Sequence, residues 1–142
     1  MTHEEILNMM ECVGNILFHD DTENLVFNFN SNHAKDIRPA VYAWVCDGEI
    51  LYIGKAGQGV AARMKEHKAG FRRGRGKSHH EFLAPIVRSG KIIEVWSMWP
   101  GFIEFEEHKI SMHSSIEDWL IASAVPRPPR NRQPARSKKQ ES

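Results

Sequence analysis

Long apolar runs are missing from this sequence. No run approaches the ~20 apolar residues that a membrane-spanning helix needs, so no transmembrane segment is expected. The opening stretch MTHEEILNMM carries acidic residues where a secretory signal peptide would carry positive charge. We therefore expect a cytoplasmic protein without a secretion signal.

Cysteine is scarce. The two cysteines, Cys12 and Cys46, lie far apart, and each sits in an apolar run. This placement favours buried, reduced thiols in a cytosolic protein over a disulfide. No Cys-x-x-Cys pair is present, so the sequence gives no indication of a zinc site of that kind.

The charge is unevenly distributed, although its sum is only +1 over 142 residues. The chain is most simply one domain, and its charged share of 26% is ordinary. Residues before 37 are mainly acidic, whereas segment 63–77 and the C-terminal tail are rich in arginine and lysine. Cationic charge confined to two segments is typical of a protein that binds a polyanion.

The first third of the chain has helical and then extended character. Thr2 and Glu5 are spaced as a capping box, and apolar residues follow at helical spacing as far as Leu17. This pattern predicts a helix of roughly residues 2–17, and Leu25–Phe29 then reads as a short strand. The acidic charge makes this segment a poor DNA contact. Packing against the core is the favoured role, with an assembly surface or a shield as alternatives.

The central stretch shows the densest pattern. Two apolar runs, Val41–Cys46 and Ile50–Ile53, flank Asp47-Gly48-Glu49, which is typical of a β-hairpin. A glycine-rich loop follows, and helical spacing of apolar residues begins at Val60. We expect the polar side chains of this unit to gather near one of its ends: Tyr42, Tyr52, Lys55, Arg63 and His67.

Glycine and basic residues alternate in segment 70–77, so this segment cannot bury an apolar face. We interpret it as a mobile cationic loop that follows phosphates, with a solvated surface loop as the alternative. A helix of about residues 78–89 should follow, although Pro85 would kink it or delay its start. Ile92–Trp99 reads as a strand, and Phe102–Phe105 as a returning strand.

The last third contains one more helix. Residues 106–113 fit no single element. Ser114 and Glu117 are spaced as a capping box, which predicts a helix that stops before Pro126. The remainder is proline-rich and basic, and we expect an extended arm that becomes disordered toward the end.

Several of these residues together resemble the GIY-YIG nuclease family. Val41-Tyr42, then Tyr52-Ile53-Gly54, then Arg63 and Glu117 follow the order of that family's hairpin, helix arginine and distant glutamate. The resemblance runs from about Ala40 to Asn131. The second motif is intact, whereas the first has Ala40 where the family name has glycine.

The resemblance implies an α+β fold with a small antiparallel sheet of about three strands flanked by helices, and here an extra N-terminal helix. The nuclease domain would span residues 39–131. Residues 1–38 would be a helix-and-strand extension, and residues 132–142 a basic, disordered tail.

The resemblance also implies roles in phosphodiester hydrolysis. Tyr42 would activate water, Tyr52 would position phosphate or water, and His67 would relay a proton or bind phosphate. Arg63 would stabilise charge on the phosphate, and Glu117 would hold Mg²⁺ or Mn²⁺. A phenol has an unperturbed pKa of about 10, so Tyr42 would need neighbouring cations to act as a base. Without the resemblance, these are ordinary strand, helix-surface and capping residues.

A further set is expected to contact DNA: Lys55, Arg72, Arg73, Arg75, Lys77, His79, His80, Arg130 and Asn131. Either His79 or His80 matches a histidine that some family members carry, and the sequence does not decide which. Asn131 resembles a family asparagine that braces the site, and a plain tail residue is nearly as good an interpretation.

The implied partner is double-stranded DNA in a bacterial or phage-infected cell. One active site cuts one strand, so double-strand cleavage would need a homodimer, a homotetramer or sequential nicking. The rival hypothesis is a catalytically inactive nucleic-acid-binding module on the same fold. An RNA-directed enzyme is a weaker third hypothesis.

Overall fold

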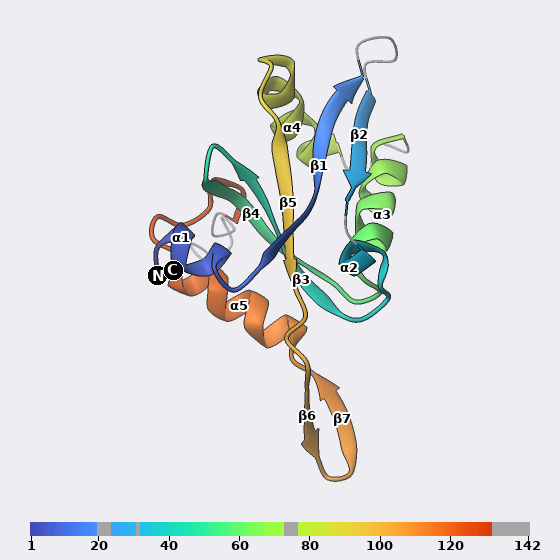
Figure 1. The fold of residues 1–142 in the computed structure, drawn as a ribbon, viewed down its shortest axis with the longest axis vertical. Helices are drawn as coiled ribbons and strands as arrows, with labels where there is room; N and C mark the ends of the chain where they lie inside the picture. Colours follow the sequence, from blue (N-terminus) through green and yellow to red (C-terminus); the bar gives the residue numbers. More distant parts are fainter. Residues whose placement is uncertain (20–23, 31, 73–76, 132–142) are drawn as a thin grey trace, which may run out of the picture.

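A five-stranded antiparallel sheet forms the centre of the protein in our computed structural model, which describes residues 1–19, 24–30, 32–72 and 77–131 (Figure 1). Its strands are β1 (Glu11–His19), β2 (Asn24–Phe29), β3 (Ala40–Cys46), β4 (Glu49–Ala56) and β5 (Ile93–Met98). Their spatial order is β2-β1-β5-β3-β4, so β4 lies at one edge. The predicted α+β class is confirmed, whereas the estimate of about three strands is wrong because β1 and β2 extend the sheet.

The predicted helix over residues 2–17 is also wrong beyond its first turns. Helix α1 (His3–Leu7) carries the expected capping box between Thr2 and Glu5, but β1 begins at Glu11. The register of β1 against β5 shifts between Cys12 and Gly14, as in a β-bulge. Val13 and Ile16 therefore both reach the core, and their three-residue spacing imitates a helix. Gly14 has no room for a side chain, because a Cβ there would lie 2.1 Å from the Asn28 carbonyl oxygen.

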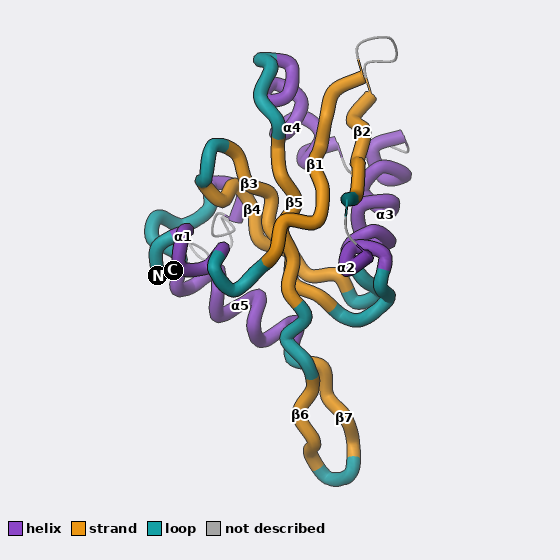
Figure 2. Tube along the Cα trace, in the orientation of Figure 1, coloured by secondary structure: helices purple, strands orange, loops and turns teal. Residues whose placement is uncertain are grey.

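Helices cover the two faces of the sheet (Figure 2). Helices α2 (Asn32–Lys35), α3 (Val60–Arg72) and α4 (Lys77–Arg88) pack on the face that receives Tyr42 and Trp44. Helices α1 and α5 (His113–Ser123) pack on the opposite face. Every residue of β3 is buried, because the strand is covered on both sides. None of the described helices is long and apolar enough to cross a membrane.

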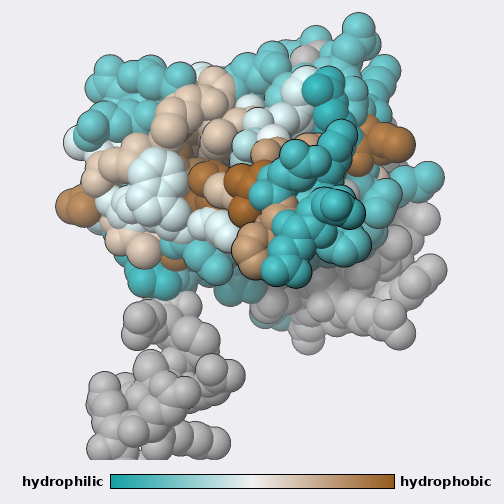
Figure 3. All heavy atoms as spheres, turned by 90° about the horizontal axis from the view of Figure 1, so that it is seen from below, coloured by the Kyte–Doolittle hydropathy of each residue, from teal (hydrophilic) through white to brown (hydrophobic). Residues whose placement is uncertain are grey.

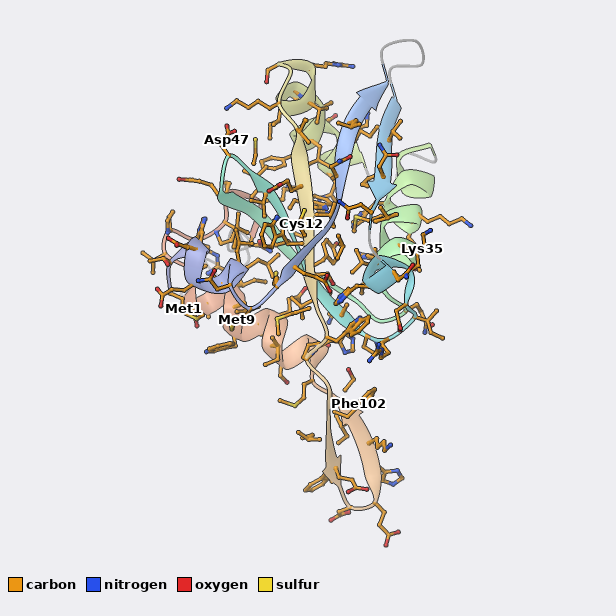
Figure 4. All side chains as sticks on the ribbon, in the orientation of Figure 1. Met1, Met9, Cys12, Lys35, Asp47 and Phe102 are labelled. Atoms are coloured by element: carbon orange, nitrogen blue, oxygen red, sulfur yellow. The ribbon has the colours of Figure 1, made fainter. Side chains whose placement is uncertain are left out.

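The predicted central hairpin is confirmed. Cys46 pairs with Glu49, and Asp47 and Gly48 form the turn with φ values of 52° and 80°. Left-handed backbone at both turn residues is what a tight two-residue hairpin requires, and Asp-Gly supplies it at low cost. Figure 4 labels Asp47 at this turn. Both cysteines are free, with Cys46 buried and Cys12 half-buried.

A second hairpin projects from the body of the molecule (Figure 1). It consists of β6 (Phe102–Phe105) and β7 (His108–Ser111), which pair only with each other within the described chain. Strand Phe102–Phe105 was expected, whereas β7 falls in the stretch that fitted no single element. Phe102, labelled in Figure 4, lies where the hairpin leaves the body. Apolar side chains are exposed on the side from which this hairpin projects (Figure 3): Phe102, Ile103, Phe105 and Ile110.

Candidate active site

The inner face of the central hairpin carries a cluster of rings. Tyr42 is fully buried, and its hydroxyl lies 2.9 Å from Nε2 of His67 on α3. The Trp44 and Tyr52 rings are 4.8 Å apart, and the His79 ring lies 5.1 Å from Tyr52. Strand alternation places Tyr42, Trp44 and Tyr52 on one face, and α3 and α4 supply the histidines.

Gly54 makes this ring cluster possible. A Cβ atom at position 54 would lie 2.5 Å from Cζ of Tyr42 and 2.8 Å from Cε2 of Tyr52. Both contacts are far inside van der Waals distance, so any side chain would displace the two phenols. The Tyr-Ile-Gly motif therefore requires glycine at position 54, because Tyr42 and Tyr52 occupy the space that a side chain would need.

Burial determines the protonation states of the cluster. It raises the pKa of Tyr42 well above the ordinary value, and the nearby Arg63 guanidinium opposes this only in part. Burial, with help from Arg63, lowers the pKa of His67 to about 3, and burial together with Arg130 lowers the pKa of His79 to about 4. At Tyr42, burial therefore outweighs the neighbouring cation Arg63, and the role of Tyr42 as a base remains a prediction. At neutral pH the Tyr42–His67 pair is a neutral phenol beside a neutral imidazole.

Arg63 stands between this cluster and solvent. Its Nη1 donates a hydrogen bond to Glu66 Oε2 at 2.9 Å. Its side chain is 39% exposed. Its Nε is buried and has no hydrogen-bond partner among the described residues. A hollow of about 370 Å³ opens beside it, lined by Lys55, Gly57, Gln58, Arg63, Glu66 and His113.

Glu117 reaches the same region from α5. Its negative charge helps to raise the pKa of Tyr52, behind burial of that phenol. Partial burial raises the pKa of Glu117 itself, while Lys55 and Arg63 act in the opposite direction. Glu117 therefore interacts electrostatically with Tyr52, Lys55 and Arg63.

The expected capping box at the start of α5 is wrong. The helix begins at His113, one residue earlier, and its N-cap Met112 makes no side-chain cap. Ser114 lies inside the helix, and its Oγ accepts a hydrogen bond from Lys55 Nζ at 3.3 Å. Among the residues that the structure describes, none donates a hydrogen bond to Glu117, so its carboxylate is not occupied by a cap.

Asn131 braces the edge strand. In the short helical turn η1 (Pro129–Asn131), its Nδ2 donates to the Ile53 carbonyl at 2.9 Å, and its Oδ1 accepts the Ile53 N–H at 2.7 Å. The side-chain amide thus pairs with the free edge of β4 as a neighbouring strand would. This pairing fixes the backbone between Tyr52 and Gly54.

His79, rather than His80, faces the ring cluster. The His79 ring lies 5.0 Å from that of His67 and 5.2 Å from that of Trp44. Arg130 holds it from the other side, with Nε 3.2 Å from His79 Nδ1. His79 therefore packs against the Trp44 and Tyr52 rings of the candidate site, and Arg130 contacts this histidine.

For four other basic residues with an expected DNA contact, the structure does not describe the side chains. Arg72 ends α3 and Lys77 begins α4, and nothing further is described for their side chains. Arg73 and Arg75 lie outside the described residues.

His113 lines the hollow but was not among the predicted site residues, because the sequence assigned it to no element. It precedes Glu117 by one helical turn, and this i,i+4 spacing would have indicated a shared face had the helix start been placed correctly. Gln58 in the glycine-rich loop was missed as well.

The residues fit a single hard cation better than a closed metal cage. The part of the chain that the structure describes holds no group of three or more histidine, cysteine, aspartate or glutamate side chains arranged to bind a metal. Glu117 offers a partly buried carboxylate to which no described residue donates a hydrogen bond. One carboxylate with several waters suits Mg²⁺ or Mn²⁺.

The fold is similar to those of two solved structures. The chain is similar to a glutamate-to-alanine mutant of bacteriophage T4 EndoII, with a TM-score of 0.63 and 17% identity, over 92% of this chain and 98% of that one. It is also similar to restriction endonuclease HPY188I in complex with product DNA, with a TM-score of 0.56 and 15% identity, over 93% and 82%. No family model and no curated protein matches the sequence. At these identities the likeness establishes the fold.

Proposed function

We propose that this protein is a metal-dependent DNA endonuclease of the GIY-YIG kind, which hydrolyses phosphodiester bonds in double-stranded DNA. Three observations support the proposal: Tyr42 contacts His67, Arg63 lines a hollow with Lys55 and His113, and Glu117 influences the pKa of Tyr52 electrostatically. Hydrolysis needs an activated water, a positive charge on the phosphate and help for the departing oxygen. These groups can meet all three needs.

Arg63 binds the scissile phosphate. Its guanidinium remains charged at all relevant pH values and pairs with phosphate oxygens bidentately. About two-fifths of its side chain is exposed and can be reached from the hollow. Lys55 adds a second cation to the lining of the hollow.

Tyr42 and His67 move the proton of the attacking water. As the water oxygen attacks phosphorus, its proton passes to the Tyr42 oxygen, and the Tyr42 hydrogen passes to His67 Nε2. The 2.9 Å contact suits this relay. The pKa of about 3 keeps His67 unprotonated in the free protein, so the negative charge of the bound phosphate must raise that pKa before Nε2 can accept the proton. Tyr52, which is half-buried beside Tyr42, positions the water or the phosphate.

Glu117 holds the divalent cation, Mg²⁺ or Mn²⁺. When bound, the cation would supply charge stabilisation to the phosphate and to the leaving 3′-oxygen. Glu117 carries no competing hydrogen bond from the described residues, and its burial favours neutralisation by a cation.

The surrounding basic residues hold the DNA backbone without reading its sequence. They comprise Lys55, Arg72, Arg73, Arg75, Lys77, His79, His80 and Arg130, with Asn131 as the brace of the site. Residues 39–131 form the nuclease unit, and residues 132–142 add a basic tail.

A supercoiled-plasmid assay with Mg²⁺ tests the proposal. The wild-type protein should convert the plasmid to nicked or linear DNA, and Glu117→Ala should reduce the rate at least 10²-fold or so, as loss of a metal ligand does. Asp118→Ala is the matched control, because it removes an exposed carboxylate next along the same helix and should cut normally. Equal rates for Glu117→Ala and the wild type would refute the metal role.

One observation favours the rival hypothesis of a catalytically inactive nucleic-acid-binding module. Tyr42 exposes none of its surface, so water can reach its oxygen only after Arg63 or Tyr52 moves. Intact plasmid with both wild type and Glu117→Ala, together with a mobility shift for both, would establish the binder instead. Sedimentation with and without DNA would show whether double-strand cleavage uses a homodimer or homotetramer.

A further inference from the structure

His113 lines the hollow beside Arg63, although it belongs to the stretch of residues 106–113 that fitted no single element in the sequence. It is the first residue of α5, and Glu117 follows one helical turn later. Its side chain lines the hollow of about 370 Å³ together with Lys55 and Arg63. The Nε2 atom points toward Gly57, where a Cβ atom would lie 3.9 Å away. Without a side chain, Gly57 leaves the space in front of Nε2 open.

A hydrogen bond to Ser111 fixes the orientation of the imidazole. Nδ1 lies 2.7 Å from the Ser111 hydroxyl, whose oxygen also accepts the backbone N–H of His113 at 3.4 Å. The hydroxyl can direct its own hydrogen to Nδ1, and in the tautomer that uses this bond the proton of a neutral imidazole is on Nε2. A protonated imidazole carries hydrogen on both nitrogens. In both of these forms Nε2 is a donor on the lining of the hollow.

The neighbouring groups make this donor part of an anion site. Lys55 Nζ is held at 3.3 Å by Ser114, the residue next to His113, so the ammonium and the imidazole stand together at the start of α5. Arg63 faces the same hollow, and the carboxylate on its lining, Glu66, is paired with Arg63. A nitrogen that already carries hydrogen does not coordinate a cation, so the arrangement suits a phosphate oxygen better than a metal.

We infer that His113 is a phosphate-binding residue that donates from Nε2 to an oxygen of the DNA backbone in this hollow. The inference rests on the proposed function, because it takes DNA as the ligand. The DNA strand would then be contacted from three elements: Arg63 from α3, Lys55 from β4 and His113 from the start of α5. Ser111 acts through His113 as a positioning residue.

Steady-state cleavage of a short duplex tests the inference. His113→Ala should raise KM on the order of ten- to a hundredfold, as expected for a lost hydrogen bond to a charged group. Its kcat should stay within about threefold of the wild-type value, because the contact is made equally in the ground and transition states. His113→Gln, which keeps an N–H donor, should recover part of the loss, and Ser111→Ala should raise KM by less than His113→Ala does. His108→Ala, on the exposed hairpin, is the matched control and should leave KM unchanged.

The outcomes separate this inference from the proposed function. If the wild type cuts DNA and His113→Ala keeps the wild-type KM, His113 is not a phosphate ligand, whereas the nuclease proposal stands. A drop in kcat at constant KM would also overturn the inference, since it would place His113 in the chemical step. Absence of cutting by the wild type would instead overturn the proposed function.

Imidazole nitrogen chemical shifts of the wild-type protein give a readout that does not depend on a variant folding. Before DNA is added, neutral His113 should carry its proton on Nε2. On titration with a short duplex in EDTA, the Nε2 resonance should shift, whereas that of His108 should not. A proton on Nδ1 of the neutral ring, or an unmoved resonance in a protein that binds the duplex, would overturn the inference.

Discussion

The two hairpins of this protein use the same local device and have opposite surroundings. Both are antiparallel, and both close through two residues with left-handed backbone: Asp47 and Gly48 at φ 52° and 80°, Glu106 and Glu107 at φ 47° and 68°. In the β3–β4 hairpin β3 is buried throughout, Tyr52 of β4 packs on Trp44 of β3, and Asn131 braces β4 at Ile53. In the β6–β7 hairpin seven of the eight strand residues are exposed, and Ser111 alone is half-buried. Apolar residues in a strand therefore become buried only where other strands and helices pack against that strand.

The difference follows from what each hairpin can bury. The β3–β4 hairpin pairs with β5 and receives helices on both faces, so its apolar side chains lose their contact with water. A hairpin that pairs with nothing else is only marginally stable in water. We therefore expect the β6–β7 hairpin to contribute little to the free energy of unfolding of the five-stranded sheet and its helices. The hairpin in turn should gain little stability from them.

The sharpest test of this contrast is a matched pair of isoleucine truncations. Ile53→Ala, in β4, should destabilise the protein by about 2–5 kcal/mol, because it leaves a cavity in a closed core. Ile103→Ala, in β6, should change stability by less than about 0.5 kcal/mol, since its side chain is 48% exposed. Urea unfolding of both variants measures the difference. Similar losses would show that β6–β7 is packed in solution.

Acid should affect the first hairpin more than the second. His67, packed against Tyr42 and Trp44, has a folded pKa of about 3, below its unfolded value of about 6.5. Between these values the unfolded state binds the extra proton, so stability is complete above pH 6.5 and falls as the pH decreases toward 3. The slope approaches about 1.4 kcal/mol per pH unit for one proton. His79 acts in the same direction down to about pH 4.

Urea titrations at several pH values measure that slope. His67→Gln should flatten it, whereas His108→Gln in the exposed hairpin should leave it unchanged. A slope unaffected by His67→Gln would mean that the imidazole is not held neutral by burial.

The smallest expected effect concerns the second turn. Glu107 adopts φ 68° without the freedom of glycine, and such backbone costs a non-glycine residue about 1 kcal/mol. Glu107→Gly should therefore stabilise β6–β7 locally by up to about 1 kcal/mol, and amide exchange in Phe102–Ser111 should slow accordingly. Gly48→Ala should do the reverse in the first hairpin. Faster exchange in Glu107→Gly would indicate that the turn is not strained.

The amino-acid sequence by itself determined the elements whose signals are local. Asp47-Gly48 between two apolar runs specifies the central hairpin, and Thr2 with Glu5 specifies the start of α1. The order of Tyr42, Tyr52, Arg63 and Glu117 indicated which side chains to look for. Their expected roles in catalysis remain predictions for the experiments above.

Only the tertiary structure decided the rest. The bulge at Cys12–Gly14 gave β1 a helix-like spacing, so pairing with β5, and not periodicity, made it a strand. Packing of α3 against Tyr42 and Trp44 set the neutral state of His67, and the ring contacts with Trp44 and Tyr52 placed His79 in the cluster. The start of α5 at His113 brought that imidazole into the hollow. Backbone turns and caps depend on a few adjacent residues, whereas strand pairing and the pKa of a buried group depend on chain segments that meet only after folding.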